Sequence, residues 1–309
     1  MRPMLATHGS HVPAGDAWMH EVKWDGIRIL ADSRLDGGSG RIRLTSRNDN
    51  DVTGGWPDVA VSPLGDRDFL VDGEIIALDE AGLPDFRVLQ ERMHVRKAKT
   101  VARLVQTVPV TFMVFDLLRL DGRDLTQEPL ETRRALLTGT LDGAAWQVPP
   151  SYDDGPMRFD ATLQQGLEGI VSKRRSSRYA FGERSKDWLK FAHRHRLSYV
   201  VGGWRPQEGT TDRLAALLVG EPTPEGLLYR GRVGSGIGAK QSRMLAEALA
   251  GHEVDASPFA DEVPRMDALG THWVEPTIVV DVETHGTGYE RLRQPSYRGV
   301  RTDLTPGDL

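Results

Sequence analysis

Residues 20 to 32 read HEVKWDGIRILAD, a polar turn between two largely apolar runs. Lys23 stands in the turn, two residues before Asp25 and three before Gly26, and Arg28 follows in the second run. A lysine at the end of a half-buried strand is most often a surface cation with its apolar stem laid along the protein. An uncharged lysine amine is a nucleophile, and burial or neighbouring cations lower the pKa of a lysine from its ordinary value of about 10.4. Further motifs are needed to decide between these roles.

The composition predicts a globular protein of more than one domain. The chain has 309 residues, of which 39% are hydrophobic and 27% are charged, and this length exceeds what one compact core usually accommodates. It contains no cysteine, which excludes a disulfide framework and fits a reducing compartment. The first ten residues lack the apolar core of a signal peptide, and no apolar run reaches the length of a membrane span. We therefore expect a cytoplasmic protein that has no membrane partner.

Positive charge is concentrated in residues 171 to 196. The formal net charge of the chain is -5, but this segment has nine Lys or Arg against two acids, a charge of +7 that leaves -12 for the remainder. Three aromatic residues are interleaved with the cations: Tyr179, Phe181 and Trp188. Such a segment suits a polyanion such as DNA or a nucleotide, although a solvated charged face has the same composition.

The first two thirds of the chain predict a mixed, largely antiparallel α+β domain. Short β-rich runs bounded by turn residues predict strands at 27–32, 41–46, 68–79 and 109–122. Helical periodicity occurs at 86–106, 129–138 and 157–166. Strands in runs with irregularly placed helices are typical of α+β proteins rather than of βαβ repeats.

The last third of the chain has a different pattern. Four or five strands separated by Gly and Pro turns are predicted within 197–206, 213–222, 226–236 and 272–283, with one helix near 239–250. Five strands and a helix in about 110 residues are typical of a small closed β-barrel, of which the OB-fold is a common nucleic-acid-binding form. We place the domain boundary between Arg194 and Leu197, giving domains 1–194 and 197–309.

Five further motifs follow the KWDG turn in order along the chain. Each has an ordinary structural explanation by itself, such as a turn, a core aromatic residue or a helix exit. Their joint order and spacing favour a functional explanation. The motifs are SRND (46–49), VDGEII (71–76), FMVFDLL (112–118), LEGIVSKR (167–174) and KDWLKF (186–191).

This series resembles the collinear motifs of the covalent nucleotidyltransferase superfamily, which comprises ATP-dependent DNA ligases, RNA ligases and mRNA capping enzymes. The C-terminal sequences VVGGWRPQEG (200–209), YRGRVGSG (229–236) and RLRQPSYRGVRTD (291–303) are similar to the ligase domain of bacterial ligase D. The resemblance implies a nucleotidyltransferase domain of mixed antiparallel sheets followed by an all-β OB-fold. It also implies an ATP-dependent enzyme that seals nicks or double-strand breaks in DNA through a lysyl-AMP intermediate, in repair by non-homologous end joining.

The resemblance also implies how the nucleotide is held. Lys23 would carry the AMP, with Asp25 beside it as a second catalytic residue. Glu21 would accept a hydrogen bond from the adenine amino group and so select adenine over guanine. Phe115 would stack on one face of the base and Val171 would cover the other, which fits apolar burial and π-stacking.

Basic side chains of the motifs would contact phosphates. Arg28 and Arg47 match phosphate-binding positions, and Arg47 matches the position that holds the 5'-phosphate of the nick, where a planar guanidinium is well suited. Lys173 and Lys190 would face the α-phosphate and stabilise the charge that develops there. Glu74 and Glu168 would supply carboxylates for the ribose and for a divalent metal ion, Mg²⁺ or Mn²⁺.

The chain departs from the family pattern at two positions. Ala192 stands where a second lysine often follows Lys190, and Leu304 stands where the last motif commonly ends in lysine. Arg298 and Arg301 remain to contact the β- and γ-phosphates. These departures keep open a catalytically weak, nick-binding scaffold as an alternative, beside an RNA ligase or a capping-type guanylyltransferase.

The resemblance further implies partners and motion. Nicked or broken double-stranded DNA would be the substrate of a monomeric enzyme, with a Ku-type end-binding protein and a separate polymerase or nuclease as further partners. The OB-fold would occupy two positions, so a hinge near residue 195 is expected. Two other motifs are weak: GSGIGA at 234–239 lacks the βαβ frame of a dinucleotide site, and HRH at 193–195 lacks the further ligands of a zinc site.

Overall fold

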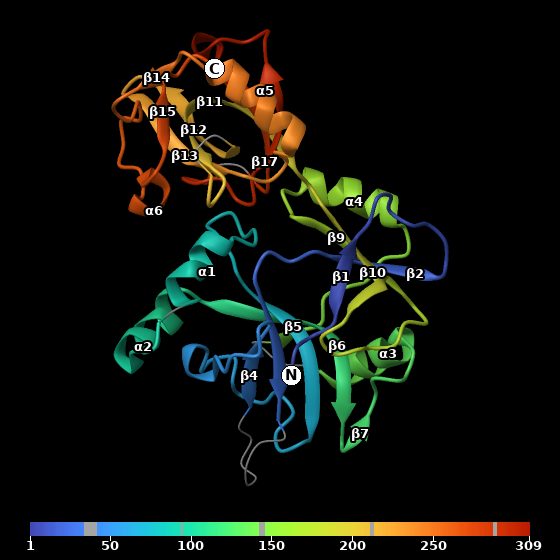
Figure 1. The fold of residues 1–309 in the computed structure, drawn as a ribbon. Coiled ribbons are helices and arrows are strands. Elements are labelled where there is room, and N and C mark those ends of the chain that lie inside the picture. Colours follow the sequence, from blue (N-terminus) through green and yellow to red (C-terminus); the bar gives the residue numbers. More distant parts are fainter. Residues whose placement is uncertain (34–41, 94, 142–145, 211–212, 287–288) are drawn as a thin grey trace. The chain divides into compact units, whose positions relative to one another are not determined.

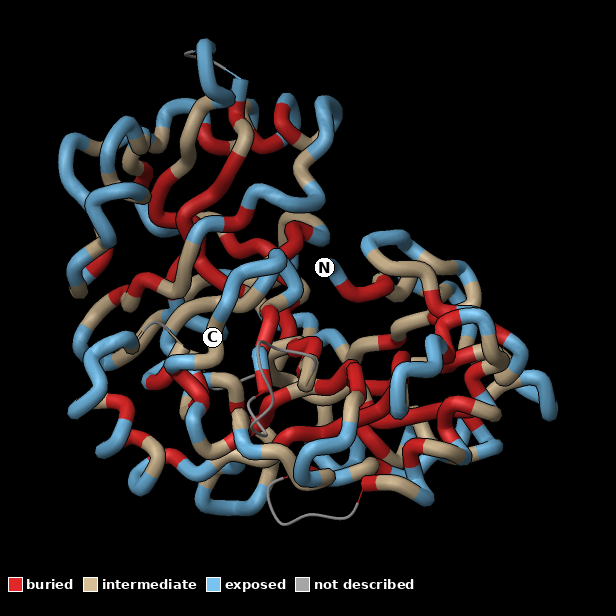
Figure 2. The backbone as a smooth tube through the Cα atoms, turned by 90° about the horizontal axis from the view of Figure 1, so that it is seen from below, coloured by how far each residue is buried: buried red, intermediate tan, exposed pale blue. Residues whose placement is uncertain are grey.

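The computed structural model describes residues 1–33, 42–93, 95–141, 146–210, 213–286 and 289–309. The chain forms two compact units, Met1–Ala192 and His193–Leu309 (Figure 1). Each unit has its own cluster of buried apolar side chains. Figure 2 shows that buried backbone lies toward the inside and that exposed backbone lies mainly in peripheral connections. No helix in these described ranges is both long enough and apolar enough to cross a membrane.

One sheet of the first unit, which we call sheet A, joins the two ends of that unit. Its strand order is β1, β10, β9 and β2, with β1 parallel to β10 and the other pairs antiparallel. Helix α4 (Gly155–Gln164) packs on β9 and β2. The strands are β1 (Leu5–His8), β2 (Trp18–Val22), β9 (Gly169–Arg174) and β10 (Arg184–Ala192).

The other sheet of the first unit, sheet B, contains its main apolar core. Its order is β4, β3, β5, β6 and β7, with β8 parallel to β6. The strands are β3 (Ile27–Asp32), β4 (Arg43–Ser46), β5 (Phe69–Ala77), β6 (Val110–Leu120), β7 (Arg123–Asp124) and β8 (Trp146–Gln147). The helices are η1 (Thr53–Gly55), α1 (Phe86–Met93), α2 (Ala98–Thr107) and α3 (Leu130–Thr140). Helix α1 packs on β5 and on α2, and α3 packs on β6.

The sequence explains why β5 and β6 are central. All but one residue of β5 and eight of the eleven residues of β6 are buried, as expected for near-continuous apolar runs covered on both faces. The KWDG turn lies against β5. A β-carbon on Gly26 would lie 2.1 Å from the carbonyl oxygen of Ile75, so this close approach of the turn to β5 requires glycine.

The second unit is an OB-fold barrel. The long strand β11 pairs with β12 along its C-terminal part and with β16 along its N-terminal part. β13 pairs with β12 and β17 pairs with β16, both antiparallel. A parallel bridge between Ser235 and Ser296 closes the barrel. The strands are β11 (His195–Pro206), β12 (Leu214–Thr223), β13 (Gly226–Val233), β14 (Glu253–Val254), β15 (His272–Val274), β16 (Val279–Thr284) and β17 (Ser296–Arg301). The helices are α5 (Ala239–Leu249), α6 (Arg265–Ala268) and η2 (Pro306–Asp308).

The predicted fold class is confirmed, and one predicted element is wrong. The pattern at 86–106 predicts one helix, but two helices form, because the backbone of Lys97 is extended at the start of α2. The break lets Leu89 of α1 and Leu104 of α2 enter the same core. Of the strand predicted at 41–46, Arg41 lies outside the described residues. The pattern did not predict the strands of sheet A, whose polar residues face the site described below.

Candidate active site

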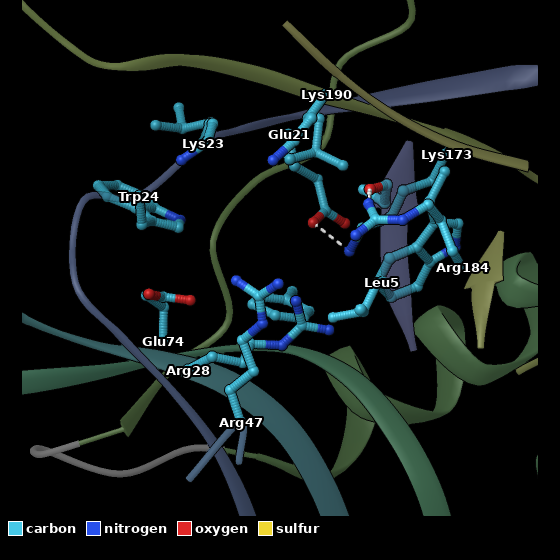
Figure 3. Close-up of a pocket in the computed structure, with 15 residues that line it drawn as sticks. Leu5, Glu21, Lys23, Trp24, Arg28, Arg47, Glu74, Lys173, Arg184 and Lys190 are labelled. Atoms are coloured by element: carbon cyan, nitrogen blue, oxygen red, sulfur yellow. Dashed lines mark hydrogen bonds and ion pairs between the residues drawn. The ribbon is translucent and has the colours of Figure 1, made fainter. Parts of the chain in front are cut away.

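A pocket of about 180 Å³ lies in the first unit, lined by residues of both sheets (Figure 3). Sheet B strands supply Arg28, Glu74 and Phe115, and Arg47 follows β4. Sheet A and its adjoining turn supply the remaining residues: Leu5, Ala6, Glu21, Val22, Lys23, Trp24, Val171, Lys173, Arg184, Trp188 and Lys190.

Strand register explains which side chains of sheet A face the pocket. Glu21 of β2 pairs with Val171 of β9, which pairs in turn with Lys190 of β10. Directly opposed residues project from the same face of a sheet, and so do residues two positions apart on one strand. Lys173 and its partner Trp188 therefore project to the same side as Val171 and Lys190. In sheet B the opposed pair Arg28 and Glu74 forms the corresponding wall.

Lys23 is fixed through its backbone and paired through its side chain. Its N–H donates to the carbonyl oxygen of Gly169 at 2.8 Å, and its Nζ lies 2.5 Å from Oε1 of Glu168. Gly169 has a φ of +141°, and a β-carbon there would lie 2.0 Å from the carbonyl oxygen of Phe191, so this position requires glycine. The side chains of Lys23 and Glu168 keep 23% and 18% of their exposure, so the amine remains accessible from the pocket.

A second lysine–glutamate pair lies deeper in the pocket. Nζ of Lys173 donates to Oε2 of Glu21 at 2.6 Å, and the two side chains are only 2% and 3% exposed. Nζ of Lys173 also lies 4.2 Å from the ring centroids of both Phe115 and Trp188, within cation–π range. Burial lowers the pKa of Lys173, and Glu21 partly opposes that change.

Glu21 retains an acceptor for a ligand. Its Oε1 is buried and has no hydrogen-bond partner among the described residues, and the nearby Nη1 of Arg134 is 3.7 Å away. Because buried polar atoms are nearly always hydrogen-bonded, this oxygen fits a donor on a bound molecule. Figure 3 shows this carboxylate and Lys173 well separated from Lys23.

Arg28 is held by a buried carboxylate rather than pointing freely into the pocket. Its Nε and Nη2 donate to the two oxygens of Asp72 at 2.5 and 2.6 Å, and the hydroxyl of Tyr179 donates to the same carboxylate at 2.5 Å. The guanidinium carbon lies 4.7 Å from the ring centroid of Phe115. Burial disfavours the charged form of Arg28 and by itself would lower its pKa. The attraction of Asp72 outweighs this effect, so the pKa of Arg28 is raised above its ordinary value. The guanidinium is thus positioned before any ligand binds.

The carboxylates near Lys23 fit a divalent cation. Burial raises the pKa of Glu74 to about 8, and Glu168 adds to that rise while Arg28 and Lys23 oppose it. Two carboxylates that disfavour each other's charge are stabilised by a shared cation. Within the described ranges no group of three His, Cys, Asp or Glu could hold a metal ion. Mg²⁺ is commonly bound by one or two carboxylates together with phosphate oxygens and water, so the pair Glu74 and Glu168 fits this type of site.

Cations converge near the amine of Lys23. Burial lowers the pKa of Lys190, and the neighbouring charges of Lys23, Arg47 and Arg184 lower it further. Lys190 and Arg184 belong to β10, Arg47 follows β4, and Lys23 stands in the KWDG turn. Such convergence stabilises negative charge, as expected of a phosphate site.

Not every predicted site residue lines the pocket. Nine of them do: Glu21, Lys23, Arg28, Arg47, Glu74, Phe115, Val171, Lys173 and Lys190. Glu168 reaches the site through Lys23, and Asp25 is not among the lining residues. Arg298 and Arg301 belong to the second unit, where Arg298 pairs with Glu283 at 2.6 Å and Arg301 with Asp303 at 2.6 Å.

Sequence reasoning assigned no role to several residues of the site. Trp24 stood within the KWDG motif, and its buried Nε1 has no hydrogen-bond partner among the described residues. Arg184 and Trp188 stood within the basic segment, where interleaved aromatic residues were the available signal. Leu5 and Ala6 belong to a four-residue strand, which is too short to give a periodic pattern.

Two family models match the chain. Residues 3–191 match the model described as ATP dependent DNA ligase domain, and residues 210–304 match ATP dependent DNA ligase C terminal region. The multifunctional non-homologous end joining protein LigD of Mycolicibacterium smegmatis is 36% identical over 313 residues, which cover 99% of this chain and 39% of that protein. The corresponding DNA repair protein of Mycobacterium tuberculosis H37Rv is 37% identical over 315 residues, covering 100% and 39%. The chain thus spans about two fifths of the length of these relatives.

Solved structures give the same assignment. Mycobacterial DNA ligase D complexed with ATP and MES matches with a TM-score of 0.57 and 36% identity over 100% of this chain and 97% of that one. The ligase domain of Mycobacterium tuberculosis LigD matches with a TM-score of 0.57 and 37% identity at the same coverage. A Lig E DNA ligase, at 16% identity and a TM-score of 0.62 over 97% and 99% of the two chains, shares the fold. From its sequence motifs, its two-unit architecture and these matches, the chain belongs to the ATP-dependent DNA ligase family.

Proposed function

We propose that this protein seals nicks in double-stranded DNA with ATP, through AMP carried on Lys23. The observation that carries the proposal is the convergence in one pocket of an accessible lysine amine, further cations, and a buried carboxylate oxygen beside an aromatic ring. A covalent nucleotidyl transfer needs these three parts: a nucleophile, a phosphate site and a base site.

The adenine site is proposed between Phe115 and Val171, with Oε1 of Glu21 accepting from the exocyclic amino group. The motif resemblance implies that Lys173 faces the α-phosphate, but its amine is engaged with Glu21 and with two aromatic rings. We therefore assign Lys173 the positioning of Glu21. A carboxylate held by a buried lysine cannot turn away from the base without leaving that ammonium unpaired.

In the first step the amine of Lys23 attacks the α-phosphorus, a phosphorus–nitrogen bond forms, and the bond to pyrophosphate breaks. Lys190, Arg47 and Arg184 stabilise the negative charge that develops on the phosphate oxygens. Mg²⁺ or Mn²⁺ bound by Glu74 and Glu168 would add positive charge against the triphosphate and compete with Lys23 for Glu168. Arg298 and Arg301 are proposed to contact the β- and γ-phosphates, and Asp25 to assist the nucleophile.

In the second step the AMP passes to the 5'-phosphate of the nick, for which Arg47 is the proposed ligand. In the third step the 3'-hydroxyl displaces AMP and the strand is sealed. The OB-fold unit would change position between these steps by rotation near residue 195. The proposed setting is end joining of broken DNA in the bacterial nucleoid. There the protein would act as a monomer that a Ku-type protein recruits, beside a separate polymerase or nuclease.

The first step can be tested without DNA. The protein is first incubated with pyrophosphate to remove any AMP already bound, and then with α-labelled ATP or GTP and Mg²⁺. An acid-labile adduct from ATP that is absent in Lys23→Ala supports the proposal, and Lys240→Ala, which removes an exposed lysine of α5, is the matched control. Labelling by GTP would indicate a capping-type enzyme, and no labelling would indicate a nick-binding scaffold.

A further inference from the structure

Four exposed cations lie on helix α2 and just before it, outside the lining of the pocket. We call Arg96, Lys97, Lys99 and Arg103 the α2 cations. None of them forms an ion pair with another described residue. The sequence has no Asp or Glu from residue 92 to residue 115, although the net charge of the chain is -5. The cluster therefore has no acidic neighbour along the chain.

Two other surface arginines of the first unit are paired with acids. Arg67 pairs with Asp121 at 2.5 Å, and Arg87 pairs with Asp85 at 2.7 Å. Like charges within an unpaired cluster repel one another. The α2 cations therefore carry an electrostatic cost that no ion pair among the described residues offsets. Such a cluster is available to an external anion.

The α2 cations are also unfavourable for the helix that carries them. The first turn of α2 has no acidic residue, and Lys97 at the N-cap makes no side-chain capping bond. Cations near a helix N-terminus oppose the helix dipole, and the like charges of Lys99 and Arg103, four residues apart, destabilise a helix further. Local stability does not account for this arrangement.

Helix α2 holds these cations on a fixed surface. Val101 and Leu104 are buried on the opposite side of the helix. Arg92 of α1 donates from Nη1 to the carbonyl oxygen of Val108 at 2.9 Å and from Nη2 to Asp58 at 2.6 Å, which connects the two helices to the rest of the unit. A rigid row of cations is suited to a regularly charged polymer.

We infer that the α2 cations form a second DNA-contact surface, which binds backbone phosphates of the duplex beside the nick. The inference rests on the proposed function, since it takes nicked DNA as the substrate. Phosphate contacts of this kind position a duplex without reading its sequence. No large hydrophobic side chain is exposed within the described residues of 92–107, whereas a protein-binding surface needs apolar or aromatic anchors.

The test compares two matched pairs of substitutions. Lys99→Gln/Arg103→Gln removes two exposed cations of α2, and Lys240→Gln/Arg243→Gln removes two exposed cations of α5. Affinity for a nicked duplex is measured over a range of salt concentrations. Each lost phosphate contact lowers the slope of log affinity against log salt by about 0.9, so the α2 pair should lower the slope by about 1 to 2 and the α5 pair should leave it unchanged.

Labelling by ATP in the absence of DNA should be the same in both variants, because that step involves no duplex. An unchanged slope in the α2 pair, or equal losses in both pairs, overturns the inference, and an unchanged slope points instead to an acidic protein partner for these cations. Sealing of the nick by the unmodified protein at low salt tests the proposed function separately. The contact surface can therefore be rejected while ligase activity stands.

Discussion

Two lysine–glutamate pairs at the pocket have nearly equal lengths and different surroundings. Lys173 and Glu21 lie 2.6 Å apart and are almost completely buried. Lys23 and Glu168 lie 2.5 Å apart, but each keeps about a fifth of its exposure. Opening a buried ion pair leaves an uncompensated charge in a medium that solvates it poorly, whereas water can replace the partner in an exposed pair. We propose that the buried pair holds the geometry of the pocket and that the exposed pair can open, as the proposed chemistry at Lys23 requires.

The largest effect is expected from the exposed pair. Lys23→Ala should reduce adenylation by at least about 10³-fold, because the variant has no nucleophile, while the free energy of unfolding should change by less than about 1 kcal/mol. Adduct formation with α-labelled ATP and urea unfolding of the same preparation measure the two quantities. A large loss of stability would show that the exposed pair also holds the fold.

The buried pair should respond in the opposite way. Lys173→Met leaves the carboxylate of Glu21 buried without its cation and should lower the free energy of unfolding by about 3 to 5 kcal/mol. The double variant Glu21→Met/Lys173→Met should recover much of that stability, since it buries no charge, but it should still fail to select ATP over GTP. Equal unfolding energies for the single and double variants would contradict the comparison.

The aromatic ring of Phe115, next to the buried pair, should affect ATP binding. Phe115→Leu keeps the apolar contact but loses stacking worth about 1 kcal/mol, so the KM for ATP in adenylation should rise about fivefold with little change in maximal rate. Phe159→Leu, in helix α4 outside the pocket, serves as the control. If both variants raise the KM equally, the effect comes from general loosening of the unit and not from the base site.

The smallest effect concerns the pH dependence near the exposed pair. Burial raises the pKa of Glu74 from 4.5 to about 8, so between these values the folded protein holds a proton that the unfolded chain has lost. By linkage, this group makes the free energy of unfolding fall as pH rises from about 5 to about 8. Glu74→Gln should remove that fall, so the variant should gain about 1 to 2 kcal/mol in free energy of unfolding on the original protein between pH 6.5 and pH 8. Urea unfolding of both proteins at the two pH values measures this difference. If the free energy of unfolding changes equally with pH in both proteins, the raised pKa of Glu74 is refuted.

Much of the fold could be predicted because apolar pattern and burial coincide. The strands of sheet B are near-continuous apolar runs, and the barrel strands are separated by Gly and Pro turns. Sheet A could not be predicted in this way. Both faces of its strands carry polar residues: Glu21, Lys173 and Lys190 face the pocket, while the opposed pair His20 and Ser172 lies on the other face. The sequence therefore lacks the apolar–polar alternation that signals a strand.

The members of the site could be predicted better than their contacts. The motifs name nine of the lining residues, but their individual roles stay predictions. The engagement of Lys173 with Glu21 joins residues 152 positions apart, and both residue types are almost never fully buried unless paired. Only the register of β2 against β9 makes that contact apparent.

The turn that presents Lys23 is attached to the start of β9. Gly169 accepts the backbone hydrogen bond of Lys23, and the adjoining residue Glu168 binds its amine. Gly169, which holds the backbone of Lys23, and Glu168, which pairs with its amine, are adjacent in the chain. A shift of that strand end therefore moves both groups together with the amine. This end of β9 can flex without separating the amine of Lys23 from the carboxylate that restrains it.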